Sequence, residues 1–262
     1  MTTDPLTILV VGSTGSIGRL VVAEALGKGH AVRALVRSPD KARRLPADAE
    51  IVVGDVTRPE TLVAAIDGVD AIVFTHGSDG TKSGAQAVDY GAVNNILDAL
   101  GGRPVRIALM TAIGVTNRTG SYNRRTEAHD WKRRAERLVR ASGNAYTIVR
   151  PGWFDYNGPD EHKLVFLQGD TRQAGDSSDG VVARAQIAQV LVASLTSPSA
   201  VGKTFELVAE RGAAQTDLDA LFARLAPDDA ATLDGVGDKA NMPLEDEPKS
   251  IRDALAGYVE AR

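Results

Sequence analysis

The chain of 262 residues has a net charge of −4, contains no cysteine, and is 43% hydrophobic. This length fits one large α/β domain with a sizeable core, and the hydrophobic content argues against disorder. The lack of cysteine excludes disulfides and thiolate chemistry, and the acidic balance does not point to nucleic acid. Residues 1–5 lack the basic region of a signal peptide and the first apolar run is too short to span a membrane, so we expect a cytoplasmic protein without a membrane partner.

A glycine-rich turn follows the first expected strand at once. The apolar run over residues 6–11 predicts a buried strand, and residues 20–26 predict a helix. Between them lies Gly12-Ser13-Thr14-Gly15-Ser16-Ile17-Gly18, in which glycines permit a tight turn, close approach to a pyrophosphate and close helix packing. Amide groups at the helix start would then face an anion. The predicted dinucleotide contacts are Gly12, Thr14, Gly15, Ser16, Ile17 and Gly18.

The Gly-x-x-Gly-x-x-Gly spacing, together with the rest of the first half, resembles the short-chain dehydrogenase/reductase superfamily. It is most similar to the atypical branch of NAD(P)H-binding or NmrA-like proteins, over about residues 6–207. The resemblance implies one doubly wound Rossmann-type α/β domain over residues 1–262, with a mainly parallel sheet of about seven strands. Residues 5–155 would form the nucleotide-binding core, and residues 156–262 the substrate cleft and a small C-terminal helical cover.

The end of the second expected strand, Ala31–Val36, bears on the choice of cofactor. NAD-preferring folds place an acidic side chain there, about twenty residues after the glycine turn, to bind the ribose hydroxyls. This chain has Arg37 and, shortly after it, Lys41. Arg37 could lie over the adenine and bind the extra phosphate of NADP, with help from Lys41 or Ser38. Alternatively, both cations solvate a helix start. We predict NADP(H) as the preferred cofactor and NAD(H) as the alternative.

The next two expected strands end in further candidate cofactor contacts. Asp55 and Val56 follow the third strand, and in the resembled family such an aspartate reaches the adenine amino group. The alternative for Asp55 is a helix cap. Thr75, His76 and Gly77 follow the fourth strand, where they would pass the linking phosphate and ribose. Because His76 has no second ligand at a useful spacing, we predict no metal site.

The fifth expected strand, residues 105–111, ends in Thr111. The resemblance implies that its hydroxyl binds a substrate carbonyl or alkoxide, and the alternative is a β-branched core residue. Residues 128–139 resemble the active-site helix of the family. In that helix Lys132 would bind the nicotinamide ribose and lower the pKa of a tyrosine four residues earlier, on the same face. That earlier position is Ala128, so the usual proton donor is missing.

Other side chains near this helix are candidate proton donors. His129 has an unperturbed pKa near 6.5 and suits proton transfer, although adjacent helical residues point about 100° apart. Tyr122 lies ten residues before Lys132, so no helical spacing links them. The predicted catalytic residues are Lys132, Thr111, His129 and Tyr122. A solvated helix face is expected at Arg133, Arg134, Arg137 and Arg140.

An aromatic cluster follows the sixth expected strand, residues 145–149. Pro151 and Gly152 resemble the family site where the backbone receives the nicotinamide carboxamide. Trp153 and Phe154 come next and, with Tyr156, would form a flat wall beside it, for which core packing is the alternative. Pro151, Gly152, Trp153 and Phe154 complete the predicted cofactor contacts, and the wall favours a flat or aromatic substrate.

Together these features predict an NADP(H)-dependent oxidoreductase that transfers hydride to a quinone, an aryl carbonyl or a similar conjugated small molecule. Such an acceptor suits the missing tyrosine, because its reduced oxygen is stabilised by conjugation and can take a proton from water or His129. Two alternatives stay open: an NmrA-like NADP(H) redox sensor without catalysis, and a tailoring oxidoreductase or oxygenase acting on aromatic secondary metabolites. The segment Val88–Gly91 resembles one that often forms a dimer face, so a homodimer is a further expectation.

Overall fold

The computed structural model describes residues 4–260, so the predicted domain limits at residues 1 and 262 lie outside the described residues. The strands are β1 (Thr7–Val11), β2 (Ala31–Val36), β3 (Glu50–Val53), β4 (Ala71–Phe74), β5 (Arg106–Met110), β6 (Ala145–Pro151), β7 (Trp153–Phe154), β8 (Lys163–Leu167), β9 (Val181–Val182) and β10 (Lys203–Glu210). The helices are α1 (Gly18–Gly27), α2 (Val63–Ile66), α3 (Lys82–Gly84), α4 (Gly91–Leu100), α5 (Ser121–Thr126), α6 (Ala128–Ala141), α7 (Arg184–Thr196), α8 (Asp219–Phe222) and α9 (Lys249–Glu260). A π-helical turn over Ala85–Tyr90 joins α3 to α4.

All ten strands belong to one sheet, in the order β3-β2-β1-β4-β5-β6-β10-β9-β7, with β8 also paired to β10. The seven from β3 to β10 are paired in parallel. This confirms the predicted mainly parallel, doubly wound fold. β8 and β9 run antiparallel to β10, and β7 pairs with β9. β7 and β9 have two residues each, too few for a periodic sequence signal.

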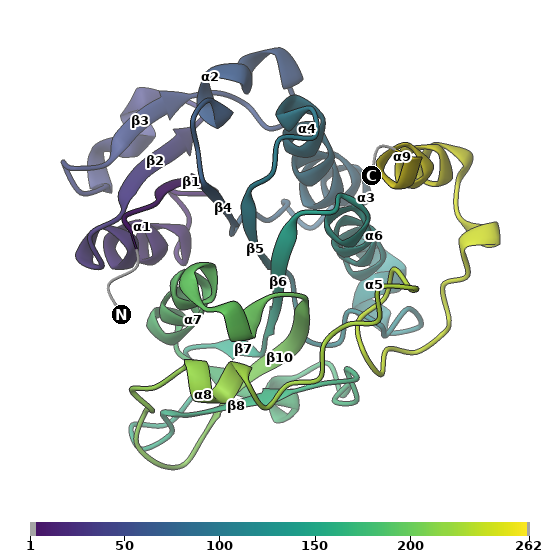
Figure 1. The fold of residues 1–262 in the computed structure, drawn as a ribbon. Helices are drawn as coiled ribbons and strands as arrows, with labels where there is room; N and C mark the ends of the chain where they lie inside the picture. The colour runs from purple at the N-terminus through teal and green to yellow at the C-terminus, as the bar shows by residue number, and fades with distance from the viewer. Residues whose placement is uncertain (1–3, 261–262) are drawn as a thin grey trace.

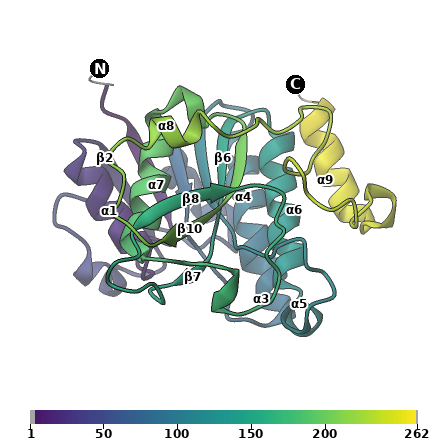
Figure 2. The same ribbon diagram turned by 90° about the horizontal axis from the view of Figure 1, so that it is seen from below.

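The central strands β1, β4 and β5 are buried on both faces, which explains their continuous apolar runs. In β1, Ile8 and Val10 pack in the core layer that includes α1 and α7, whereas Leu9 and Val11 pack in the layer that includes α4 and α6. Figure 1 shows the sheet between these helix pairs, and Figure 2 shows the same layers from below, with α9 outside α6. Because the seven strands are parallel, their carboxyl ends lie at one edge of the sheet. The chain builds the sheet outward in one direction from β1 to β3 and in the other direction from β4 onward, so the switch point lies between β1 and β4. Ligands bind at such a switch point in open α/β sheets.

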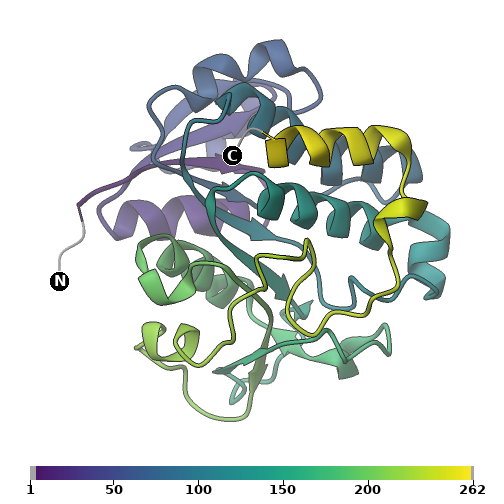
Figure 3. The same cartoon turned by 45° about the vertical axis from the view of Figure 1, so that its right-hand side comes forward.

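The prediction of a solvated arginine face on α6 is wrong. All four arginines are buried, and Arg133 has no exposed surface. The acidic segment 226–248 crosses this side of the molecule and supplies their partners, as the path between α8 and α9 in Figure 3 shows. Asp234 bonds both Arg133 at 3.0 Å and Arg137 at 2.8 Å, and Glu247 bonds Arg134. The arginines of α6 therefore bind the acidic segment 226–248 to the rest of the fold through buried ion pairs.

Two further findings concern the described residues as a whole. None of the helices within residues 4–260 is long and apolar enough to cross a membrane. The same part of the chain holds no group of three or more acidic, histidine or cysteine side chains placed to bind a metal ion.

Candidate cofactor and active site

The glycine turn leaves no room for a side chain at Gly12 or at Gly18. Gly12 has φ +87°, and a Cβ atom there would lie 2.6 Å from the backbone nitrogen of His76 at the end of β4. A Cβ atom on Gly18 would lie 2.1 Å from the carbonyl oxygen of Gly12. The amide of Gly15 donates to that same oxygen at 2.9 Å and closes the turn. Because no side chain stands in the way, a phosphate can come close to the backbone at the start of α1.

The other residues of the turn have different surroundings. Ile17 is buried in the core, so only its backbone is available to a ligand. Thr14 lines a cavity at the carboxyl edge, whereas Ser16 is exposed and its hydroxyl accepts a hydrogen bond from Arg184 at 3.1 Å. Thr75 does not line the cavity. Its buried hydroxyl donates to the carbonyl of Val11 at 3.1 Å and so joins β1 to the end of β4.

The cavity at the carboxyl edge, of about 500 Å³, brings together most of the side chains predicted to hold the adenine half of the cofactor. Predicted contacts that line it are Gly12, Thr14, Arg37, Lys41, Asp55, Val56, His76 and Gly77. They come from the ends of four neighbouring strands, as a switch-point site requires.

Asp55 and Arg37 give this cavity its charge. The carboxylate of Asp55 accepts hydrogen bonds from the amide and the hydroxyl of Thr57, at 2.9 and 2.8 Å. These bonds, with the nearby charge of Arg37, lower the pKa of Asp55, so it is ionised at neutral pH. Asp55 thus shapes the turn that follows β3, close to the helix-capping role given as its alternative. It also lines the cavity, where its carboxylate can accept hydrogen bonds. Arg37 faces the same space and provides a cation for a phosphate.

His76 also lines this cavity, and one of its ring nitrogens is buried. Burial, followed by the charge of Lys132, lowers the pKa of His76 to about 4, so its ring is neutral. Nε2 lies 3.5 Å from the carbonyl oxygen of Asp89, and the buried Nδ1 has no hydrogen-bond partner among residues 4–260. Buried polar atoms in proteins are normally paired. The glycine turn and the cation of Arg37, rather than this inaccessible nitrogen, are the features of the site that fit the predicted cofactor.

Lys132 is held by a partner that the sequence did not reveal. Its ammonium lies 2.6 Å from Oδ1 of Asp89, whose carboxylate is almost fully buried. The other carboxylate oxygen accepts a hydrogen bond from Ser78 at 2.6 Å. Asp89 lies in the π-helical turn, a feature that often marks functional sites. Ala128, at the expected place of the tyrosine, is 1% exposed and packs in the core.

The structure brings Tyr122 and His129 together despite their unfavourable spacing. Glu127, with φ 55°, separates α5 from α6 and turns the chain back. The two ring centroids consequently lie 5.2 Å apart. Burial lowers the pKa of His129, and its Nδ1 has no hydrogen-bond partner in the described part of the chain. Lys132 follows His129 by three residues and therefore lies on the same helix face.

Thr111 and the aromatic wall complete the predicted set. The hydroxyl of Thr111 donates to Glu136 at 2.7 Å inside the fold, so its contact with substrate stays a prediction. Gly152 is held against β9, because a Cβ atom there would lie 2.4 Å from the carbonyl oxygen of Gly180. Pro151 accepts a backbone hydrogen bond at 3.1 Å from Ile113. The predicted aromatic wall comes next in the chain, where Trp153 is 40% exposed and Phe154 is half-buried.

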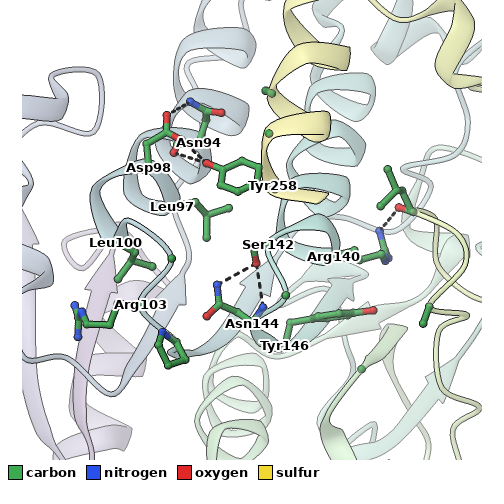
Figure 4. A pocket seen from close by; sticks show the side chains of 18 of the residues that line it. Asn94, Leu97, Asp98, Leu100, Arg103, Arg140, Ser142, Asn144, Tyr146 and Tyr258 are labelled. Carbon is green, nitrogen blue, oxygen red and sulfur yellow. Dashed lines mark hydrogen bonds between the residues drawn. The ribbon is translucent and has the colours of Figure 1, made fainter. Parts of the chain in front are cut away.

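A larger cavity, of about 1200 Å³, lies at the opposite edge of the sheet (Figure 4). It is bordered by the segments that precede β5 and β6, by the acidic segment and by α9. Its polar groups pair with one another: Tyr258 donates to Asp98, and Tyr146 donates to Asp228 at 3.0 Å. No residue predicted for the cofactor or catalysis lines it. The smaller cavity is therefore the candidate functional site.

The fold and the site define a Rossmann-type dinucleotide-binding protein. Residues 12–198 match a family described as NAD(P)H-binding, and the chain belongs to that family. Over 264 aligned residues it is 26% identical to sanguinarine reductase of Eschscholzia californica, with 84% of this chain and 96% of that protein covered.

Two solved structures show the same fold. The oxidoreductase YlbE of Lactococcus lactis aligns with a TM-score of 0.67 and 18% identity, over 84% of this chain and 99% of that one. A short-chain dehydrogenase/reductase of Veillonella parvula in complex with NADP aligns with a TM-score of 0.58 and 16% identity, over 78% and 94%. The comparisons confirm the predicted family, the NAD(P)(H) cofactor and the class of enzyme, an NAD(P)-dependent oxidoreductase.

Proposed function

We propose that this oxidoreductase uses NADPH to reduce a quinone, an aryl carbonyl or another conjugated small molecule. The observation that supports this most directly is the Lys132–Asp89 ion pair, at 2.6 Å, beside a buried Ala128. A lysine that activates a tyrosine needs a free positive charge next to the phenol. Here a carboxylate compensates that charge and the phenol is missing, so the site has no strong acid for the alkoxide of an ordinary ketone.

A conjugated acceptor does not need that acid. Its reduced oxygen spreads the negative charge over the conjugated system and takes a proton from water, so that NADPH, a proton and the quinone give NADP⁺ and the hydroquinone. NADPH, when bound, supplies the hydride. The chain contributes binding and orientation. Arg37 and Asp55 hold the adenosine end, and the wall of Trp153 and Phe154 keeps the acceptor flat against the nicotinamide.

We assign His129 and Tyr122 to the acceptor side of the site. A neutral imidazole beside a phenol offers hydrogen bonds to a developing oxyanion without giving up a full proton. In this proposal Lys132 binds the nicotinamide ribose, and its hydrogen bond to Asp89 at 2.6 Å holds the ammonium group. The relative named sanguinarine reductase supports a reductase rather than a sensor or an oxygenase.

Four further assignments belong to this proposal. The preferred cofactor is NADPH, because Arg37 and Lys41 rather than a carboxylate follow β2. The protein is cytoplasmic. Residues 5–155 and 156–262 form one domain, since β6 and β10 pair in a single sheet. A homodimer forms through the helix that includes the segment Val88–Gly91.

The test is NADPH oxidation by the purified protein, measured by nicotinamide absorbance against quinones, aryl ketones and aliphatic ketones of matched size. We expect turnover with the conjugated acceptors and none with the aliphatic ketones. The double variant Tyr122→Phe/His129→Gln should lower quinone turnover by less than the 10²- to 10⁴-fold that loss of a general acid brings, roughly tenfold. If NADPH binds but none of the acceptors is reduced, the proposed reductase activity is wrong and the redox sensor is favoured.

A further inference from the structure

Arg184, the first residue of α7, reaches across the molecule to the glycine turn. Its Nε donates to the hydroxyl of Ser16 at 3.1 Å, although 168 residues separate the two in the sequence. The contact arises because α1 and α7 lie side by side against the same face of the sheet (Figure 1). A cation from a distant part of the chain therefore lies at the turn that would receive the cofactor diphosphate.

The other contacts of this guanidinium are exposed to solvent on one side. Nη1 pairs with the carboxylate of Asp155, and the group lies 5.2 Å from the ring centroid of Phe154. The side chains of Arg184 and Asp155 are 34% and 50% exposed, so water screens their attraction. Nη2 has no hydrogen-bond partner within residues 4–260. The guanidinium thus has an unused donor and a weak carboxylate partner.

We propose that Arg184 is a clamp for the cofactor diphosphate, which closes by exchanging Asp155 for phosphate oxygens. The amides of the glycine turn would hold one side of the diphosphate and Arg184 the other. The planar guanidinium suits this task, because it can donate two parallel hydrogen bonds to a phosphate. Asp155 would stay in place during the exchange, since its other oxygen accepts a hydrogen bond from the backbone amide of Arg184 at 2.8 Å.

The clamp and Arg37 act on different phosphates. Arg37 lines the cavity at the end of β2, beside Asp55, where the 2′-phosphate that distinguishes NADPH from NADH would lie. Arg184 lies at the start of α1, where the diphosphate common to both cofactors would lie. Loss of Arg184 should therefore weaken both cofactors equally, whereas loss of Arg37 should weaken NADPH selectively.

The test is a titration of the intact protein with NADPH, NADH and 2′-AMP, which carries the adenosine and the 2′-phosphate but no diphosphate. Arg184→Gln should weaken NADPH and NADH by the same factor, about tenfold to thirtyfold, and leave 2′-AMP unchanged. Arg37→Gln should weaken NADPH and 2′-AMP but not NADH. Arg172→Gln, which removes an arginine of similar exposure from a pair with Glu210, should change none of the three.

Asp155→Asn separates a clamp from a structural ion pair. It keeps the acceptor for the Arg184 amide but removes the carboxylate that competes with phosphate, so we expect both NADPH and NADH to bind about threefold more tightly. If the ion pair only supports the fold, Arg184→Gln and Asp155→Asn should shift all affinities by less than twofold, or weaken them together. Either result would overturn the clamp and leave the assignment of the cofactor to the glycine turn intact.

Discussion

The cations of the cofactor cavity and the cations of α6 look alike in the sequence, and the structure uses them in opposite ways. Arg37 and Lys41 face an open space at the carboxyl edge. Arg133 and Arg137 are buried and bound by the carboxylate of Asp234. Among residues 4–260, Arg37 and Lys41 form no ion pair, although the charge of Arg37 acts on the nearby Asp55. Arg133 and Arg137 are instead neutralised by a segment about one hundred residues away. An arginine points to a ligand only when the fold leaves its charge unmatched.

The two cavities show the same difference. The larger one adjoins the acidic segment and α9, and its polar groups already bond one another. The smaller one has the glycine turn and an arginine that forms no ion pair within residues 4–260. Volume alone would select the wrong edge of the sheet.

The largest expected effect is on stability, from Arg150 in the buried charge network. Its guanidinium lies 2.6 Å from both Glu136 and Asp238 and is 1% exposed. Arg150→Met should lower the free energy of unfolding by about 3–5 kcal/mol, because it leaves buried carboxylates without a counter-charge. Urea unfolding measures this, with the exposed pair of Arg43 and Asp40 as control: Arg43→Met should cost less than about 1 kcal/mol. Equal losses would mean that the network is not buried as described.

The glycine turn should show the complementary effect, on binding. Gly18→Ala places a methyl group 2.1 Å from the carbonyl oxygen of Gly12, so the turn must shift. We expect NADPH to bind about 100-fold more weakly, with a smaller loss of stability. Gly27→Ala, in the same helix with open space around it, is the matched control and should leave the affinity unchanged. Unaltered binding by Gly18→Ala would contradict the assigned phosphate site.

Taken over one pH unit, the smallest expected effect is a pH dependence of stability at Glu206. Burial raises the pKa of Glu206 to about 8, so its carboxyl is protonated at neutral pH. The stability that protonation provides is complete below the unfolded pKa near 4.5 and is lost as pH rises through 8, with a slope of at most about 1.4 kcal/mol per pH unit. Glu206→Gln should remove this slope, as measured by denaturant unfolding across the window. Glu210→Gln, exposed on the same strand, should retain it.

Features with a local cause could be predicted from the sequence. The strand, glycine turn and helix of residues 6–26 follow from backbone sterics and apolar runs, and the candidate residues at strand ends follow from a parallel sheet. Pairs between distant segments could not. The basic helix and the acidic segment were both visible, but nothing in either pattern fixes that Arg133 meets Asp234, 101 residues away.

The same limit applies to the active site. The π-helical turn that places Asp89 next to Lys132 cannot be recognised from the spacing of apolar residues. Arg184 contacts Ser16 only because α1 and α7 pack together. The approach of Tyr122 to His129 depends on one residue, Glu127, in a left-handed conformation. Each of these contacts is set by how the elements pack rather than by the spacing of residues in the sequence.

Hydrogen–deuterium exchange with and without NADPH tests the central claim most directly, because it shows which edge of the sheet binds the cofactor. We predict slower exchange in residues 12–18, 37–41, 54–57 and 76–79, which surround the smaller cavity. Residues 98–104, 142–146 and 228–233, around the larger cavity, should exchange at unchanged rates. Protection confined to the second set of segments would contradict the account.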